Sequence, residues 1–406
     1  MAFSSLPLSY CTNVHPCRSV ADVDGALERY TAPVRDRCGF DIAAGLWLPS
    51  AAAVEAAGSA VALHSIADSL RRRNLTCYTL NAFPYGDFHS ARVKENVYLP
   101  DWSDLRRADY TLTCAQLLAG LLVGDTDGSI STLPLGFSGF DHPPDFLDRA
   151  IEQLLRVAGE LAEIFARTGK RIRLAIEPEP FCLLEQTEPT VAFFARLFAE
   201  AERRGCASTA REYLGVCYDV CHQAVEFEDA AWAVERIDSA GIRINKVQIS
   251  CAIELEDPTE VTQRNALARF VEPRYLHQTM ARAADGTILR AIDLAEQLVQ
   301  SPSPQWLAAR PWRVHFHVPV DAQRLGVLGT TRHELVRALS AIGRLSYAPH
   351  LEVETYTWPV LPGHDAMELV EGLAREMLAT RTLIGPVGRS PIDTGSNDID
   401  GKMSGF

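Results

Sequence analysis

The chain has 406 residues, 47% of them hydrophobic and 22% charged, so it can bury one large core or two smaller ones. It carries 52 acidic and 39 basic residues, for a formal net charge of -13. This acidic balance, without a basic run, argues against nucleic acid or an anionic membrane surface as the main partner, and it favours a small ligand or a cation.

No signal for export or membrane insertion opens the sequence. A basic segment followed by an apolar core and a cleavage site is missing, and no run of about eighteen apolar residues occurs. We therefore expect a cytoplasmic protein without a membrane-inserted segment. Cys217, Cys221 and His222 suggest a zinc site, but no second cysteine pair follows, and small buried cysteines are the commoner explanation.

Short apolar segments alternate with longer amphipathic segments, which is typical of parallel α/β folds. No composition shift or Gly/Ser-rich linker divides the chain, and no G-x-G-x-x-G follows the first strand, as a dinucleotide-binding sheet would require. We therefore predict a single (β/α)8 TIM barrel over residues 1–384. Its first seven strand units are expected within residues 6–16, 40–49, 75–89, 128–137, 173–180, 213–229 and 242–250.

The closing part of the chain contains two further strand-like segments, residues 313–320 and 350–358, which makes nine in all. The sequence leaves open whether residues 313–320 belong to the barrel wall. Residues 251–312 are predicted to be an insertion after strand seven that covers the barrel mouth, with a hairpin turn at Asp285-Gly286. Residues 385–406 are rich in Gly, Ser, Pro and Asp and are predicted to be a disordered tail.

Acidic and amide side chains follow several of the predicted strands. Glu177 comes directly after the apolar run Leu174-Ala175-Ile176, where an ionised carboxylate needs a partner because burying it alone costs several kcal/mol. In a (β/α)8 barrel the C-terminal strand ends converge. An oxygen-rich group there suits Mg²⁺ or Mn²⁺ better than Zn²⁺. The predicted ligands are Glu177, Asp219, Gln248 and Glu354.

Each of these residues also has a structural alternative. Asp219 and His222 are spaced as a capping or hydrogen-bonded pair, and Gln248 alone would be a satisfied core amide. Glu352 lies on the same side of its strand as Glu354, which is nearer the strand end. His315 and His317 likewise share a face, and His317 is kept as an additional or replacement metal ligand. The joint occurrence on successive strands favours the metal site.

Four segments, IEPEP (176–180), YDVCH (218–222), KVQIS (246–250) and VETYTW (353–358), resemble the xylose isomerase-like superfamily of sugar isomerases and epimerases. The resemblance implies one divalent metal held by a Glu, an Asp, a His or Gln, and a Glu; the Gln form resembles hydroxypyruvate isomerase. It implies that Glu177 and Glu354 hold the metal and move protons, and that His222 contacts a substrate oxygen.

Longer motifs, such as LNAFPYGDFH (80–89), VHFHVPV (314–320) and ETYTWPVLP (354–362), resemble bacterial metabolite traffic proteins of the EboE type. That resemblance covers nearly the full length. It implies a role in moving a biosynthetic precursor between cell compartments, with other proteins of the pathway as partners and without an established reaction.

A catalytic site of this kind would isomerise or epimerise a hydroxy-carbonyl compound, with Glu177 and Glu354 as the acid/base pair. Asn81, His89 and His15 are candidate substrate contacts, or else turn and loop residues. The alternative function is a non-catalytic protein that binds a small metabolite or acts as a scaffold. Metal-assisted hydrolysis, as in barrel endonucleases, is disfavoured by the acidic balance and the few histidines at strand ends.

Overall fold

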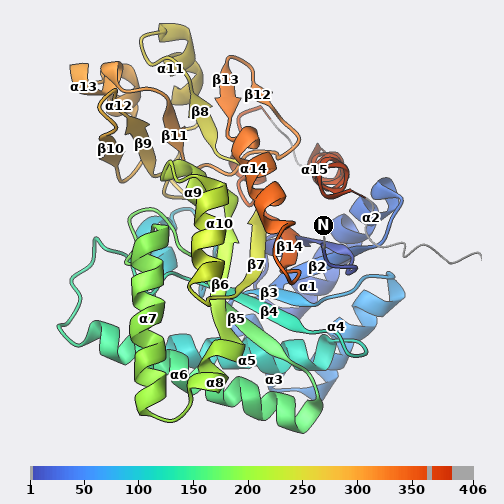
Figure 1. Ribbon diagram of the computed structural model, residues 1–406. Helices are drawn as coiled ribbons and strands as arrows, with labels where there is room; N and C mark the ends of the chain where they lie inside the picture. Colours follow the sequence, from blue (N-terminus) through green and yellow to red (C-terminus); the bar gives the residue numbers. More distant parts are fainter. Residues whose placement is uncertain (1–2, 364–367, 386–406) are drawn as a thin grey trace, which may run out of the picture.

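The computed structural model describes residues 3–363 and 368–385, so the predicted tail from residue 386 lies outside the described residues (Figure 1). Eight parallel strands close into a barrel in the order β1-β14-β7-β6-β5-β4-β3-β2, which confirms the predicted TIM barrel. The strands are β1 (Leu8–Cys11), β2 (Ile42–Trp47), β3 (Thr79–Asn81), β4 (Gly128–Thr132), β5 (Ile172–Ile176), β6 (Leu214–Asp219), β7 (Ile244–Ile249) and β14 (His350–Val353).

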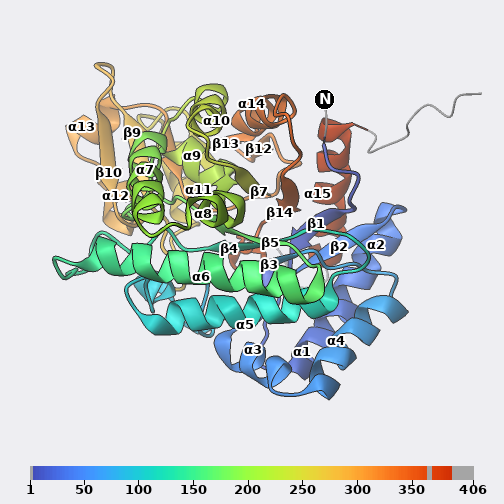
Figure 2. The ribbon, with the colours of Figure 1, turned by 60° about the horizontal axis from the view of Figure 1, so that its bottom comes forward.

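Amphipathic helices cover the outside of the barrel, and α5 and α6 lie side by side along it (Figure 2). In α6 the buried residues Ala150, Leu154 and Leu161 recur at helical spacing, which places them on one face. The helix ends at Gly169, whose φ of 70° is left-handed. The helices of the barrel are α1 (Val20–Ala26), α2 (Ala32–Cys38), α3 (Ser50–Ala57), α4 (Ala60–Arg72), α5 (Leu105–Leu121), α6 (Phe146–Thr168), α7 (Thr187–Arg203), α8 (Ala207–Tyr213), α9 (Val220–Val225), α10 (Ala230–Ser239), α14 (Arg332–Ile342) and α15 (Glu368–Ile384).

Short turns of other helix types connect these elements. They are the 3-10 helices η1 (Thr12–Val14), η3 (Lys94–Tyr98) and η4 (Trp358–Val360), and the π-helix η2 (Leu27–Thr31). Within the described residues, no single helix is long and apolar enough to cross a membrane; α3 and α4 meet the length and composition test only as a pair bent by 105°.

A second, six-stranded sheet lies between β7 and β14 in the chain, with the order β10-β9-β11-β8-β13-β12. Figure 1 shows it, with α11–α13, above α9 and α10. The hairpin expected at Asp285-Gly286 joins β9 to β10, and Gly286 has a φ of 87°. The elements are β8 (Ile253–Leu255), α11 (Val261–Ala268), β9 (Thr279–Arg282), β10 (Ile288–Ala291), α12 (Glu296–Gln300), α13 (Pro304–Ala308), β11 (Trp312–Val314), β12 (Arg324–Leu325) and β13 (Leu328–Thr330).

The place of residues 313–320, which the sequence left open, is outside the barrel wall. Arg313 and Val314 belong to β11, which pairs with β8 and β9, while His315 and His317 continue as an extended segment. The second sheet continues past the expected end at residue 312, because β13 pairs with β8. The eighth barrel strand is β14.

Ion pairs connect the second sheet to the barrel loops. Arg290 in β10 pairs with Glu185 and lies 3.6 Å from Glu226, which follows α9. Lys94 in η3 places Nζ 2.6 Å from Asp293 Oδ2. The sheet is therefore held against the C-terminal side of the barrel, where Tyr275 lines a cavity together with Glu177 and Glu354.

Candidate metal and active site

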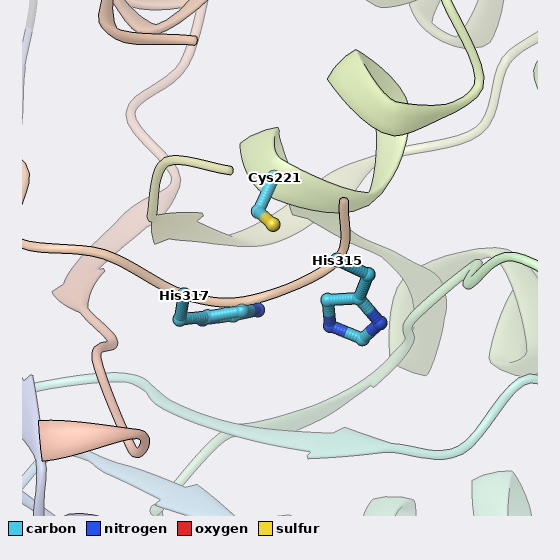
Figure 3. Close-up of side chains that lie close together, drawn as sticks. All are labelled: Cys221, His315 and His317. Carbon is cyan, nitrogen blue, oxygen red and sulfur yellow. The ribbon is translucent and has the colours of Figure 1, made fainter. Parts of the chain in front are cut away.

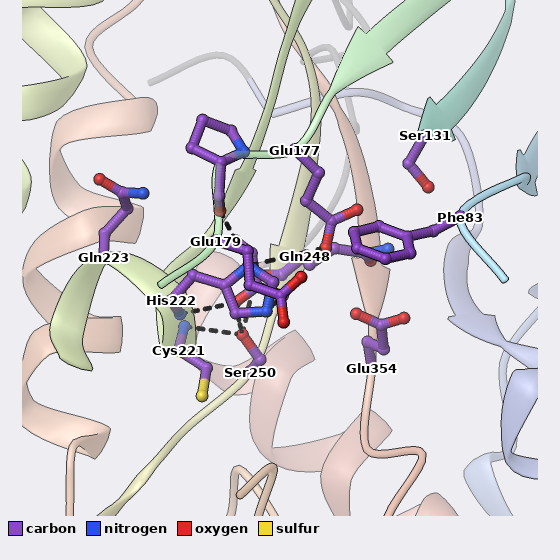
Figure 4. Close-up of polar contacts among 12 residues, drawn as sticks. Phe83, Ser131, Glu177, Glu179, Cys221, His222, Gln223, Gln248, Ser250 and Glu354 are labelled. Carbon is purple, nitrogen blue, oxygen red and sulfur yellow. Dashed lines mark hydrogen bonds and ion pairs between the residues drawn. The ribbon is translucent and has the colours of Figure 1, made fainter. Parts of the chain in front are cut away.

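Three buried carboxylates meet at the C-terminal end of the barrel. Glu177 follows β5 and Glu354 follows β14 (Figure 4). Asp219 ends β6. Each offers one oxygen, and the three oxygens lie within 4.8 Å of one another. The predicted residues meet because the C-terminal ends of the parallel strands share one face of the barrel.

Gln248 completes this group from β7, where its Cα is in register with Asp219 and Glu352. Its side chain is fully buried, and neither side-chain oxygen nor nitrogen has a hydrogen-bond partner among the described residues. Glu177 Oε2 and Asp219 Oδ2 also lack a partner within that part of the chain. Such atoms are costly when buried, and three oxygens from separate strands fit the ligand set of a hard divalent cation.

The raised pKa values of two of these carboxyls also favour the binding of a cation. Burial raises the pKa of the Glu177 carboxyl well above its usual range, and the nearby Glu354 and Asp219 raise it further. The pKa of Glu354 is likewise raised well above its usual range, by burial and then by Asp219 and Glu352. Burial and mutual repulsion therefore favour the protonated carboxyls in the absence of a cation, and a bound cation would favour the charged forms.

Two amides hold Glu354 in place. Asn13 Nδ2 and Asn81 Nδ2 donate to Glu354 Oε1 at 2.8 and 2.9 Å. Asn81 ends β3, and its own side-chain oxygen accepts a hydrogen bond from the backbone of Phe83 at 2.9 Å. Asn81, predicted as a substrate contact, thus lines the cavity and also positions a predicted metal ligand.

A buried ion pair forms the layer beneath the carboxylates. Lys246 Nζ lies 2.6 Å from Glu352 Oε2, and neither side chain is exposed. Gly45 leaves the room for Glu352, because a Cβ at this position would lie 1.5 Å from Glu352 Oε1. Of the two acids that share a face of β14 and its extension, Glu352 therefore pairs inside the barrel and Glu354 lines the cavity.

Three histidines surround the carboxylates, each with Nδ1 facing an oxygen acceptor, so Nδ1 carries the proton. Burial lowers the pKa of His317 to about 4 and that of His315 well below its usual range. His317 Nε2 lies 4.0 Å from Asp219 Oδ2 and has no hydrogen-bond partner among the described residues. The acceptors are Pro178 O for His222 (2.9 Å), Gln278 Oε1 for His315 (2.7 Å) and Glu354 O for His317 (2.9 Å).

Cys221 lies beside His315 and His317, which come from one extended segment (Figure 3). Burial raises the pKa of the Cys221 thiol well above its usual range, so the side chain is a neutral thiol. A thiol is a poor metal ligand compared with a thiolate. The oxygen and nitrogen atoms are therefore the stronger candidates for ligands.

The other two predicted substrate contacts are not among the residues that line the cavity. His15 Nε2 is 3.0 Å from the hydroxyl of Tyr10, and its ring stacks on Tyr30. His89 Nε2 is 2.8 Å from the carbonyl oxygen of Asn13, so it supports the loop that holds Glu354. His15 and His89 thus contact neighbouring residues and do not line the cavity.

The cavity combines this polar floor with aromatic walls. Among the described lining residues, Lys94 is the only lysine or arginine, and its Nζ contacts Asp293 Oδ2 at 2.6 Å and the carbonyl oxygens of Glu272 and Tyr275 at 3.0 and 2.6 Å. The positive charge of Lys94 is therefore already paired with Asp293. The aromatic lining residues are Phe83, Phe88, Tyr98, Tyr275 and Tyr356.

Sequence reasoning missed several residues of the site. Glu179 lines the cavity and accepts a hydrogen bond from the Tyr98 hydroxyl at 2.7 Å. Its signal was present as the second acid of the IEPEP segment. Asn13 follows a four-residue strand, and a short polar side chain in a turn is too common to single out.

The fold is that of xylose isomerase-like TIM barrels. No family model and no curated protein matches the sequence. One similar solved structure is a xylose isomerase-like TIM barrel protein from Mycobacterium smegmatis in complex with magnesium, with a TM-score of 0.51 and 12% identity over 95% of this chain and 100% of that chain. At this identity, the likeness shows the fold alone.

Two further solved structures are similar at lower scores. An L-ribulose 3-epimerase has a TM-score of 0.47 and 13% identity over 93% of this chain and 92% of that chain. The IOLI protein with a binding zinc atom has a TM-score of 0.46 and 11% identity over 93% of this chain and 98% of that chain.

Proposed function

We propose that the protein is a divalent-metal-dependent isomerase or epimerase of a hydroxy-carbonyl compound. The observation that carries this proposal is the convergence of Glu177, Asp219, Gln248 and Glu354, with unpartnered buried atoms on the first three. These four residues would hold Mg²⁺ or Mn²⁺, with His317 as an additional or replacement ligand beside Asp219. Such an ion supplies Lewis-acid polarisation of a carbonyl and its neighbouring hydroxyl.

Glu177 and Glu354 are the proposed acid/base pair. They approach the cavity from β5 and β14, which are not adjacent in the barrel, so a bound substrate can lie between them. One carboxylate takes the proton from the carbon next to the carbonyl, and the other carboxyl group returns a proton. Asn13 and Asn81 fix Glu354 for this task by donating to one of its oxygens. His222 lines the same cavity and is the proposed contact to a substrate oxygen.

The cavity walls favour a neutral substrate with an apolar face. Aromatic rings such as Phe83 and Tyr356 offer apolar surface to a sugar-like ring or chain. A phosphorylated substrate would need a free cation, and Lys94 is already paired with Asp293. We therefore expect unphosphorylated hydroxy-ketones and sugars to react in preference to their phosphates.

The experiment is to incubate the full-length protein with Mg²⁺ or Mn²⁺ and a panel of hydroxy-ketones and sugars in deuterated water. Isomerisation, or deuterium uptake at the carbon next to the carbonyl, is the expected result. Glu177→Gln and Glu354→Gln should abolish it, while Glu226→Gln, a buried acid outside the cavity lining, should keep it. A wild type that binds no divalent ion would overturn the proposal.

A second candidate function is binding and transfer of a small metabolite without turnover, together with other proteins of one pathway in the cytoplasm. It is supported by the aromatic cavity and by the motifs that resemble EboE-type metabolite traffic proteins. Binding alone needs the cavity walls but no proton transfer. Under this function, panel compounds should bind with similar affinity to the wild type and to Glu177→Gln, without deuterium uptake in either.

A further inference from the structure

Two buried histidines point ring nitrogens at each other beside the carboxylate group. His222 Nε2 and His315 Nε2 are 3.1 Å apart. His222 comes from α9, directly after β6, whereas His315 comes from the segment that leaves β11 of the second sheet. Both side chains are buried and both line the cavity, so the pair is made only when the second sheet packs on the barrel.

The Nδ1 contacts of the two rings indicate which nitrogen of each ring is placed to donate a hydrogen bond. His222 Nδ1 faces the carbonyl oxygen of Pro178, and His315 Nδ1 faces the side-chain oxygen of Gln278. The Gln278 amide is oriented by its nitrogen, which donates to the Tyr98 hydroxyl at 3.0 Å and to Glu179 Oε1 at 3.3 Å. Each Nδ1 therefore faces an acceptor and is placed to donate to it, and each Nε2 then presents a lone pair when the ring is neutral.

Two lone pairs that face each other repel unless a proton or a cation lies between them. Zinc binds histidine nitrogen at about 2.0–2.1 Å. Two nitrogens on one zinc ion, at angles from a right angle to the tetrahedral angle, are therefore roughly 2.8–3.4 Å apart. The separation of 3.1 Å between His222 and His315 matches that range. Outer hydrogen bonds from Nδ1 to an oxygen are also the usual support of metal-binding histidines.

Glu179 is the third residue of this cluster. One of its carboxylate oxygens lies within 4.8 Å of one ring nitrogen of each histidine. Oε1 is 3.5 Å from His315 Nδ1 and accepts a hydrogen bond from the Tyr98 hydroxyl at 2.7 Å. Asp219 Oδ2, which has no partner among the described side chains, lies 3.9 Å from His222 Nε2 and thus borders both groups of ligands.

We propose that His222, His315 and Glu179 bind a second divalent cation, next to the ion proposed for Glu177, Asp219, Gln248 and Glu354. Its two nitrogen ligands favour Zn²⁺ or Co²⁺, in contrast to the oxygen ligands of the first site. The second ion goes beyond the proposed function, which requires only one. It would place a second cation on the cavity wall, and His222 would then reach a substrate oxygen through this ion and not directly.

The test is a metal count on the full-length protein. The protein is stripped with a chelator, dialysed against Zn²⁺ or Co²⁺ and analysed for metal content. We expect two ions per chain in the wild type, one in His315→Gln and one in Glu354→Gln. His350→Gln removes another buried histidine, which contacts Ser129 at the other end of β14, and it should keep both ions.

Cobalt titration gives a second readout that does not depend on a variant folding. A low-coordinate site with nitrogen ligands gives Co²⁺ stronger visible absorption than a six-coordinate oxygen site, so the wild type should show two different steps. Glu179→Gln should weaken the more intense step. Circular dichroism checks that each variant is folded.

One ion per chain in the wild type, lost in Glu354→Gln and kept in His315→Gln, would overturn the second site and leave the proposed function standing. The His222–His315 contact would then be an N–H···N hydrogen bond of a protonated pair. No ion in the wild type would overturn both proposals.

Discussion

Lys246 and Glu352 form an ion pair inside the barrel, one layer beneath the carboxylates of the cavity, with Nζ 2.6 Å from Oε2. Burial alone lowers the pKa of a lysine, but the attraction of Glu352 outweighs that effect and raises the pKa of Lys246 above its usual value. Lys246 therefore stays charged. Its positive charge also opposes, in part, the rise in the pKa values of Glu177 and Glu354.

Removing one member of this pair should cost far more stability than removing both. Lys246→Met leaves the Glu352 carboxylate buried without a counter-charge, so we expect a loss of about 3–5 kcal/mol in the free energy of unfolding. The double variant Lys246→Met/Glu352→Gln removes both charges and should recover much of that loss. Denaturant unfolding of the wild type, Lys246→Met, Glu352→Gln and the double variant measures the coupling, and strictly additive losses would contradict the ion-pair explanation.

Asn81 should control metal affinity through Glu354. Asn81→Ala removes one of two hydrogen bonds to Glu354 Oε1, so the carboxylate is less well oriented, and we expect Mn²⁺ affinity to fall about tenfold to a hundredfold. Asn245→Ala is the matched control, because Asn245 donates to Leu174 O outside the cavity lining. Calorimetric titration measures both. Equal losses in the two variants would indicate a general effect on folding.

Metal binding should strengthen as pH rises. The metal-free pKa values of Glu177 and Glu354 are raised, so these carboxyls hold protons near neutral pH and must release them when the ion binds. Affinity should therefore increase from pH 5.5 to pH 8. Calorimetry in two buffers of different ionisation enthalpy counts the protons released, and Glu177→Gln should release fewer. Binding heats that are independent of the buffer would refute this prediction.

Glu226 should make the folded state less stable at high pH. Burial, and then repulsion from Glu185, raises the pKa of its carboxyl to about 7. A group whose pKa is raised in the folded state contributes stability that is complete below its unfolded pKa, near 4.3, and is lost as pH rises through 7. The free energy of unfolding should fall by up to about 4 kcal/mol over this pH range.

The measurement is denaturant unfolding at pH 5.5 and pH 8.5. The stability of Glu226→Gln relative to the wild type should rise between the two values, because Gln cannot ionise. Glu185→Gln should keep most of the dependence, since burial is the larger cause of the shift. A pH-independent difference between Glu226→Gln and the wild type would contradict the assignment.

The barrel and the carboxylate group could be predicted because both depend on local patterns. Apolar runs such as Leu174-Ala175-Ile176 indicate strands buried on both faces, and the barrel topology makes the strand ends converge. Gln248, which alone resembled a core amide, was included because it followed Asp219 on the next strand. In the structure the Cα atoms of these two residues are paired.

Other parts of the site have no local signal. Lys246 reads as an ordinary strand residue, and only the packing of β7 against β14 shows that its charge is paired with Glu352. His15 and His89, predicted as substrate contacts, lie outside the residues that line the cavity. His15 stands next to polar neighbours in the sequence, but its ring is buried against Tyr10 and Tyr30.

By itself, the sequence determined the order of strands and helices, the closed barrel, and the acids at the strand ends, because hydrophobic periodicity and strand ends are local properties. Only the tertiary structure decided that Glu352 faces Lys246 and that His315 meets His222, which is 93 residues earlier. Contacts of this kind depend on how the second sheet packs on the barrel. That packing is set by the complementary shapes and charges of many side chains, which no single stretch of sequence contains.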